Sequence, residues 1–270
     1  MAAAGAEIGV IGGSGFYQFL EHTEPRPVNT PYGPPSAPVT VGVVGDRPVA
    51  FLPRHGVAHE LPPHRVNYRA NIWALHHLGV RRVIAPCAVG SLRPEIAPGD
   101  FVLLDQLVDR TWGRPDTYAD GPVVSHISFA DPYCPELNEA VAAAREHTAA
   151  LASLTLHRGG TVVVIQGPRF STRAESRWFR SAGWQVVNMT QYPEAYLARE
   201  LGMCFCGLAL VTDYDTGLEG VEGIEPVTMQ QVFATLAANV SRTRDLLFAA
   251  IPGIAATPAC HCADAASSAP

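Results

Sequence analysis

Lysine is absent from this chain of 270 residues: all nineteen positive charges are arginine, and the net charge at pH 7 is −6. An acidic chain without lysine has no basic stripe that could follow a phosphate backbone, so we expect no nucleic-acid partner. Charged residues make up only 16% of the chain, whereas hydrophobic residues make up 47%. This balance suits a well-buried core and argues against disorder.

Long apolar runs are absent as well. No segment approaches the roughly 20 apolar residues that span a membrane, and residues 1–7 lack the basic region and apolar core of a secretory signal. No linker rich in Ser, Gly or Pro separates halves of different composition. We therefore expect one domain covering residues 1–270, a cytoplasmic location and no membrane partner.

Cysteine is sparse, with six residues, too few for a disulfide framework in a chain of this length. Free thiols are therefore the default expectation. The tail Cys260-His261-Cys262 contains zinc-ligand residue types, but the sequence offers no second ligand pair nearby, so we expect no metal. Whether Cys204, Cys206, Cys260 and Cys262 form bridges is left open by the sequence.

Helical and extended patterns alternate along most of the chain, which predicts an α/β layer fold with a mixed, twisted sheet flanked by helices. Strands are expected at residues 7–11, 39–44, 49–52, 83–85, 101–104 and 161–166, near 186, and in the run that ends at 213. Helices are expected at residues 68–77, 135–147, 173–181, 193–201 and about 228–251. The Ala/Ser/Pro-rich stretch after Cys262 is expected to fray.

Two aspartates, Asp213 and Asp215, follow the apolar run 207–211 at the carboxyl end of a predicted buried strand. Open α/β sheets place ligand groups at this end of their strands. Alternation along a strand would point both carboxylates to the same face, where they could protonate and hold a nitrogen-rich leaving group. A solvated turn after the strand explains the pair equally well.

Glycine is concentrated in GGSG at residues 12–15, where the first predicted strand ends. Such a loop can curl its amides around an anion, with the Ser14 hydroxyl as an extra donor. A dinucleotide fingerprint is excluded, because its spacing would require glycine at Gln18. Arg54 and His55 follow the second hairpin strand and could clamp an anion, although a surface ion pair would also explain them.

Two further segments carry small or flat side chains after predicted strands. The residues Cys87 and Ala88 would let the backbone approach a ligand closely. Met189 supplies a thioether surface and Thr190 a hydroxyl. Core packing would account for Met189 without any function.

Six motifs occur together in the order seen in one family: GGSG at 12–15, RHG at 54–56, VNYRANIWAL at 66–75, GPRF at 167–170, NMT at 188–190 and TDYD at 212–215. On these motifs the chain resembles the trimeric purine nucleoside phosphorylases, most of all their branch that acts on S-methyl-5′-thioadenosine. The resemblance covers roughly residues 7–252 and leaves 253–270 as a tail. It implies a single phosphorylase domain, a homotrimer, a nucleoside substrate, and inorganic phosphate as co-substrate with no other cofactor.

Carried over by position, the resemblance also implies site residues. Phosphate would be held by Ser14, Arg54, His55, Cys87, Ala88 and Thr190. The nucleoside would contact Phe170, Ser171, Met189, Asp213, Asp215, Met229 and Val232, and His126 would reach the 5′ group in a neighbouring subunit's site. Two departures stand out. Cys87 replaces a threonine of many relatives and is a weaker donor, and Thr216-Gly217 replaces Cys-Trp before a longer loop that borders the 5′ pocket.

Two positions favour adenine over hypoxanthine as the base. The 6-oxopurine branch of the family carries glutamate where this chain has Ser171, and asparagine where it has Asp213. Adenine N1 has a lone pair and no hydrogen, so a buried carboxylate facing it would be repelled, which serine avoids. Asp215 can accept from the adenine amino group, and Asp213, if protonated, can act as general acid on the departing base.

The function that follows is phosphorolysis of S-methyl-5′-thioadenosine. Phosphate would attack the anomeric carbon from the face opposite the base, with its negative charge beside an oxocarbenium-like transition state. Three alternatives remain: a 6-oxopurine nucleoside or methylthioinosine phosphorylase, a related hydrolase that uses water, and a catalytically silent nucleoside-binding protein. Phosphate dependence separates the first two from each other, while Arg54 and Asp213 argue against the third.

Overall fold

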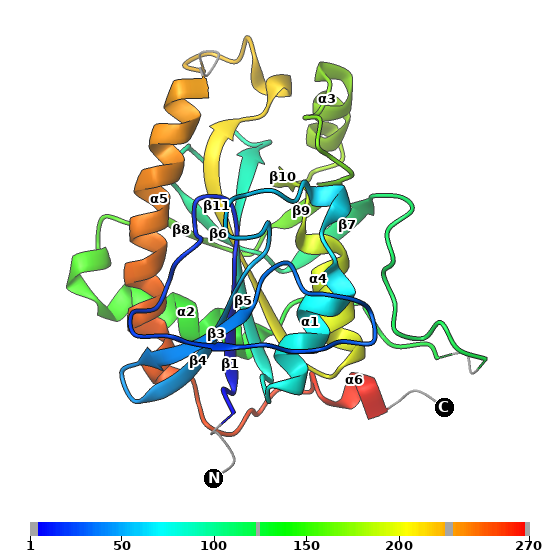
Figure 1. The fold of residues 1–270 in the computed structure, drawn as a ribbon. Helices are drawn as coiled ribbons and strands as arrows, with labels where there is room; N and C mark the ends of the chain where they lie inside the picture. Colours follow the sequence, from blue (N-terminus) through cyan, green and yellow to red (C-terminus); the bar gives the residue numbers. More distant parts are fainter. Residues whose placement is uncertain (1–4, 123–124, 225–228, 268–270) are drawn as a thin grey trace.

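The computed structural model describes residues 5–122, 125–224 and 229–267 (Figure 1). Its centre is a mixed sheet that has 11 strands over the described residues. Eight of them follow the order β2-β3-β4-β1-β5-β10-β9-β7. The other three form a branch, in which β11 pairs with β5 and β6, and β6 pairs with β8. The strands are β1 (Ile8–Gly12), β2 (Glu24–Arg26), β3 (Val39–Val44), β4 (Arg47–Pro53), β5 (Arg82–Ser91), β6 (Phe101–Leu103), β7 (Gln106–Arg110), β8 (Leu156–Arg158), β9 (Thr161–Ile165), β10 (Val186–Asn188) and β11 (Cys204–Tyr214).

Helices cover both faces of this sheet. Figure 1 shows α1 (Tyr68–His77) and α4 (Gln191–Glu200) on one side, and α2 (Pro135–His147) and α5 (Met229–Ala250) on the other. The short helix α3 (Arg173–Ser181) lies near the carboxyl ends of β5 and β11, and α6 (Asp264–Ser267) lies at the opposite end of the molecule. Among the described helices none is both long and apolar enough to cross a membrane.

The centre of the sheet explains the continuous apolar runs of the sequence. Strands β5 and β11 pair in parallel from Arg82 and Cys204 to Ser91 and Tyr214. Nearly every residue of these two strands is buried, because a helical layer covers each face. The apolar side chains form one core cluster with α1 and α4 and a second with α2 and α5.

Most predicted elements are confirmed. The helices at 68–77, 135–147 and 173–181 occupy the predicted ranges. Local capping explains this agreement: the Asn67 side chain accepts from the amide of Ala70, and Thr172 forms a capping box with Glu175. The hairpin at 39–53 and the long helix α5 are also confirmed.

Three short strands were not predicted, and one predicted strand is longer than expected. The missed strands β2, β7 and β8 have polar sequences, EPR, QLVDR and LHR, and are partly exposed. Their pairing with neighbouring strands, rather than apolar periodicity, makes them extended. Strand β5 runs on from the predicted 83–85 to Ser91, because β10 and β11 pair with its second half.

The prediction of a frayed tail after Cys262 is wrong for the described residues. Cys262 is buried, and α6 begins two residues later. The tail is held on the body of the protein by Glu136 of α2, whose Oε2 accepts the amides of Ala259 and Cys260 at 2.7 and 2.8 Å. These contacts join residues more than 120 positions apart, so local composition did not reveal them.

Candidate active site

Strands β1 and β4 bring the first two predicted anion loops together. They run parallel, with Gly12 paired to Pro53, so the GGSG loop and Arg54 leave the sheet side by side. The amide of Arg54 donates to Gly12 O at 2.9 Å, and a Cβ added at Gly13 would lie 2.9 Å from Arg54 Nη1. Gly15 has φ +77° and packs against Val240 of α5. Only glycine allows this close approach, which also brings α5 to the loop.

Arg54 is only 1% exposed and already has a partner, contrary to a surface ion pair. Its Nε and Nη2 donate to the two carboxylate oxygens of fully buried Glu194, at 2.5 and 2.9 Å, and Nη1 donates to Pro86 O at 3.1 Å. A guanidinium has five N–H donors. Two hydrogens on the terminal nitrogens therefore remain for an anion, while Glu194 fixes the orientation of the fork.

His55 lies beside Arg54 as a neutral ring. Burial, together with the positive charge of Arg54, lowers the pKa of His55 to about 4. Its Nδ1 lies 2.8 Å from Leu61 O. Because a carbonyl oxygen only accepts, Nδ1 carries the hydrogen and Nε2 presents a lone pair. His55 therefore adds no second positive charge at neutral pH and could only accept a hydrogen bond through Nε2.

Cys87 lies in a buried polar layer beneath this loop. Burial raises the pKa of its thiol to about 11, so it is a neutral group, and Asn188 and Gln191 are close to it. Among the described residues, the donor Asn188 Nδ2 and the acceptor Gln191 Oε1 are buried without a hydrogen-bond partner. Thr190 is buried and Ala88 half-buried in the same region. Asn188 thus offers a donor that could offset the weak thiol.

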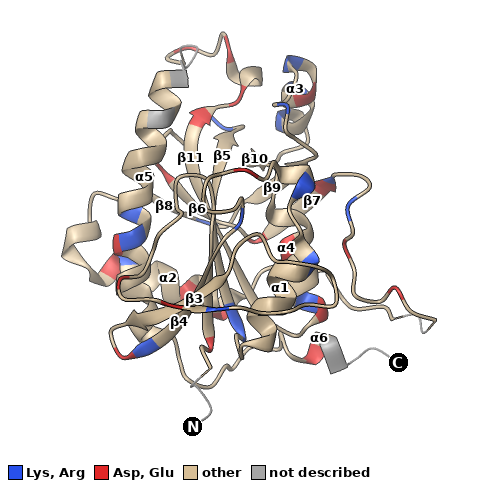
Figure 2. Cartoon of the chain, in the orientation of Figure 1, with Lys and Arg blue, Asp and Glu red and all other residues tan. Residues whose placement is uncertain are grey.

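The carboxyl end of β11 carries Asp213, and Figure 2 shows red, the colour of acidic residues, at the tip of this strand. A β-bulge between Val211 and Asp213 shifts the pairing with β5 and re-aims the strand end. The hydroxyl of the bulged Thr212 lies 2.6 Å from Asp213 Oδ1 and 3.2 Å from Val89 O. It has one hydrogen, so it can donate to the ionised carboxylate or, once Asp213 holds a proton, to Val89 O.

Burial, with a smaller contribution from the negative charge of Asp215, raises the pKa of Asp213 to about 6, although the hydrogen bond from Thr212 opposes this shift. A carboxyl with this pKa holds a proton in a useful fraction of molecules near neutral pH, which a general acid requires. The interpretation of Asp213 and Asp215 as a solvated turn does not fit, because both side chains are largely buried.

Asp215 and Ser171 lie close to each other under α3. Burial raises the pKa of Asp215, against the hydrogen bond from Ser176. Within the part of the chain that the structure describes, Asp215 Oδ2 and Ser171 Oγ are buried and neither is well aligned for a hydrogen bond. A Cβ added at Gly90 would lie 3.4 Å from Asp215 Cβ, so the neighbouring strand leaves little room there. An acceptor and a hydroxyl are therefore available to the polar edge of a ligand.

Met189 and Phe170 belong to two loops that meet. A Cβ added at Gly167, which has φ +63°, would lie 2.6 Å from Met189 Sδ. Arg114 holds both loops, because its Nη2 donates to Gln166 O at 2.8 Å and to Met189 O at 3.0 Å. Phe170 is 72% exposed, unusual for a large apolar side chain. An exposed ring beside this edge is available to stack on a flat ligand.

Three predicted site residues, His126, Val232 and Met229, are not placed by the structure beside the aspartates of β11. His126 is exposed in the excursion between β7 and α2, which Figure 1 shows extending away from the tip of β11. Val232 is half-buried on α5. Met229 begins α5, but its side chain lies outside the described residues. The roles of these three residues stay predictions.

The sequence matches the family described as the phosphorylase superfamily over residues 7–251. The chain belongs to the phosphorylase superfamily. This match covers every element of the sheet from β1 to β11, together with α5. It confirms the resemblance first seen in the six ordered motifs.

Several relatives of this phosphorylase are closely similar over nearly their whole length. The S-methyl-5′-thioadenosine phosphorylase of Mycolicibacterium smegmatis is 57% identical, covering 94% of each chain. The purine nucleoside phosphorylase of Streptomyces coelicolor is 52% identical, covering 93% of this chain and 90% of its own. The methylthioadenosine phosphorylase of Schistosoma mansoni, solved in complex with adenine, is 37% identical with a TM-score of 0.87, covering 97% of this chain and 96% of its own.

Three residues of this phosphorylase that support the site were not predicted. Glu194 and Arg114 hold Arg54 and the Met189 loop, and the Asn239 side chain of α5 donates to Val211 O at 3.0 Å beside the bulge. Each acts on a partner at least 28 positions away. A charged or amide residue inside an apolar helical face, such as Asn239, is the signal that could have indicated a buried partner.

Proposed function

We propose that this enzyme, a purine nucleoside phosphorylase-type pentosyltransferase, catalyses the phosphorolysis of S-methyl-5′-thioadenosine to adenine and 5-methylthioribose 1-phosphate, in purine and methionine salvage. The observation that carries the base preference is the carboxyl pair of Asp213 and Asp215 with Ser171 beside it, at the end of β11. The relatives that act on S-methyl-5′-thioadenosine support the 5′ preference. Inorganic phosphate is the proposed co-substrate, without another cofactor.

The proposed mechanism assigns each loop one task. Phosphate binds between the GGSG amides and the free hydrogens of Arg54, facing the anomeric carbon from the side opposite the base. Its negative charge stabilises the oxocarbenium-like transition state in a site that is already organised. Asp213 shares its proton with N7, which makes adenine a better leaving group, and Asp215 accepts from the exocyclic amino group.

A substrate panel tests the proposal. Base release should be measured from S-methyl-5′-thioadenosine, adenosine, inosine and 5′-methylthioinosine, each with and without phosphate. We expect phosphate-dependent adenine release, fastest from the methylthio substrate. Preference for the inosines would assign a 6-oxopurine phosphorylase and overturn the roles of Ser171 and Asp213. Base release without phosphate would assign a hydrolase and remove Arg54 from substrate binding.

The pH dependence of kcat/KM should carry the signature of Asp213. Its raised pKa of about 6 means that the protonated, acid-competent form dominates below pH 6 and decreases above it. Because phosphate also titrates, the ratio of wild type to Asp213→Asn should be followed, which cancels the contribution of phosphate. We expect this ratio to fall about tenfold per pH unit above pH 6. A ratio that stays flat with pH would remove Asp213 as the acid.

The homotrimer and the cytoplasmic location are proposed together with this activity. The exposed position of His126, on an excursion that leaves its own chain's site, is consistent with a role in a neighbouring subunit. Sedimentation or light scattering would test the trimer. If the protein is monomeric and fully active, His126 has no part in the site.

A further inference from the structure

Four of the six cysteines converge at the end of the molecule opposite the active site. Cys134, Cys204, Cys260 and Cys262 lie with all four Sγ atoms within 4.8 Å of one another. Three of them are buried and Cys260 is half-buried. In the sequence, no second pair of possible zinc ligands lies near Cys260 and Cys262. The fold brings such a pair to them: Cys134 from the start of α2 and Cys204 from the start of β11. We propose that these four thiols bind one structural zinc ion.

The spacing of the sulfur atoms suits one tetrahedral metal ion. Zinc bound by four thiolates at about 2.3 Å places each pair of sulfurs about 3.8 Å apart. Cys204 Sγ and Cys260 Sγ are 3.3 Å apart, and no pair of the four sulfurs is more than 4.8 Å apart. Shifts of a few tenths of an ångström to about 1 Å would therefore produce the tetrahedron. The structure records all six cysteines as free thiols.

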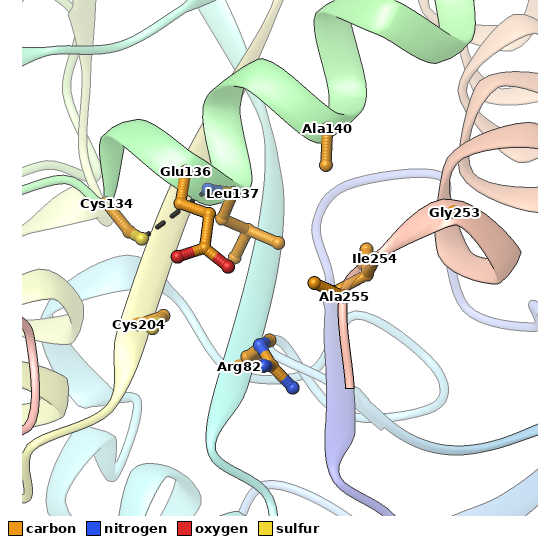
Figure 3. Close-up of a pocket in the computed structure, with 9 residues that line it drawn as sticks. All are labelled: Arg82, Cys134, Glu136, Leu137, Ala140, Cys204, Gly253, Ile254 and Ala255. Carbon is orange, nitrogen blue, oxygen red and sulfur yellow. Dashed lines mark hydrogen bonds between the residues drawn. The ribbon is translucent and has the colours of Figure 1, made fainter. Parts of the chain in front are cut away.

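The surroundings of the cluster hold its ligands in place. Cys134 is the N-cap of α2, and its Sγ accepts the amide of Leu137 at 3.5 Å (Figure 3). The amino end of a helix favours a thiolate. Glu136, two residues further along, accepts hydrogen bonds from the amides of Ala259 and Cys260 and so fixes the tail. Hydrogen bonds of this kind commonly orient the ligands of a metal site.

The ligand set identifies the class of ion and its role. Four thiolates without carboxylates or an open position are typical of structural zinc sites. His261 is not a ligand, because its side chain is 92% exposed and its Nδ1 lies 2.9 Å from an Asp264 carboxylate oxygen. Arg82 lines the adjoining pocket together with Cys134 and Cys204 (Figure 3).

The zinc would hold the fold together without contributing to catalysis. Cys204 begins β11 and Asp213 lies near its other end, so about 30 Å of strand separate the two sites. The four ligands join the start of α2, the start of β11 and the C-terminal tail. Binding would thus tie the last residues of the chain to the core by exchanging thiol protons for the metal.

Metal analysis of the full chain tests the proposal. Protein should be produced in the cytosol of an expression host, purified without chelator or affinity metal, and analysed by plasma mass spectrometry. We expect about one zinc per chain, released in full when a mercurial reagent titrates the thiols. Cobalt(II) exchanged into the wild-type protein should give the intense visible bands of a tetrahedral tetrathiolate, a readout that needs no variant.

Matched variants place the zinc. Cys260→Ser combined with Cys262→Ser should abolish stoichiometric zinc and lower Tm, while Cys206→Ala, a buried cysteine of the same strand outside the cluster, should retain it. Zinc absent both as purified and after reconstitution under reductant would overturn the proposal. The proposal would also be overturned if the intact mass, measured without reductant, were lower by the mass of the hydrogens lost in forming two disulfides.

Discussion

Replacing Asp213 with asparagine should lower kcat/KM for S-methyl-5′-thioadenosine by about a hundred to ten thousandfold. This corresponds to roughly 3 to 5 kcal/mol of lost transition-state stabilisation, because a positioned acid supplies most of the help to the leaving base. Asparagine keeps the size and shape of the side chain, so the bulge at Thr212 should persist. Steady-state kinetics of adenine release at fixed phosphate measures the effect.

Two neighbouring variants make this result specific. Tyr214→Phe, which removes only the bond from the Tyr214 hydroxyl to Pro94 O, should leave kcat/KM within about threefold of wild type. Asp215→Asn should weaken binding of the 6-amino group and therefore act mainly on KM. If Asp213→Asn loses less than about tenfold, the carboxyl is not the acid and the mechanism must use another proton source.

Replacing Glu194 with glutamine should lower the free energy of unfolding by about 3 kcal/mol. Arg54 and Glu194 are buried almost completely, at 1% and 0% exposure, so loss of one charge leaves the other uncompensated in the core. Glutamine fills the same volume, which separates the charge effect from a cavity. Denaturant unfolding at a fixed protomer concentration, with and without phosphate, measures it.

Phosphate should partly reverse this loss. A guanidinium that has lost its carboxylate binds an anion more strongly, so phosphate should raise the Tm of Glu194→Gln by more than that of wild type. The double variant Arg54→Met with Glu194→Leu should regain stability but show no phosphate effect, since buried pairs can often be replaced by apolar groups. A loss below about 1 kcal/mol in Glu194→Gln would mean that the pair behaves like a surface ion pair.

The predictable part of this protein is local. Helix α3 could be bounded because Thr172 and Glu175 form a capping box within four residues. The apolar run before Asp213 revealed a buried strand, and chain order placed the aspartates at its carboxyl end. By contrast, β7 and β8 were missed, because they are strands by virtue of their partners β9 and β6 rather than of their own composition.

The sequence by itself determined the sheet-and-helix alternation, the glycine loop, and the position of the two aspartates at the carboxyl end of a buried strand. Only the tertiary structure decided that Glu194 neutralises Arg54, that burial raises the pKa of Asp213, and that Cys134 and Cys204 join the cysteines of the tail. The physical reason is that caps, turns and strand ends depend on neighbours a few residues away. Ion pairs, desolvation and thiol clusters depend on which distant segments the core packs together.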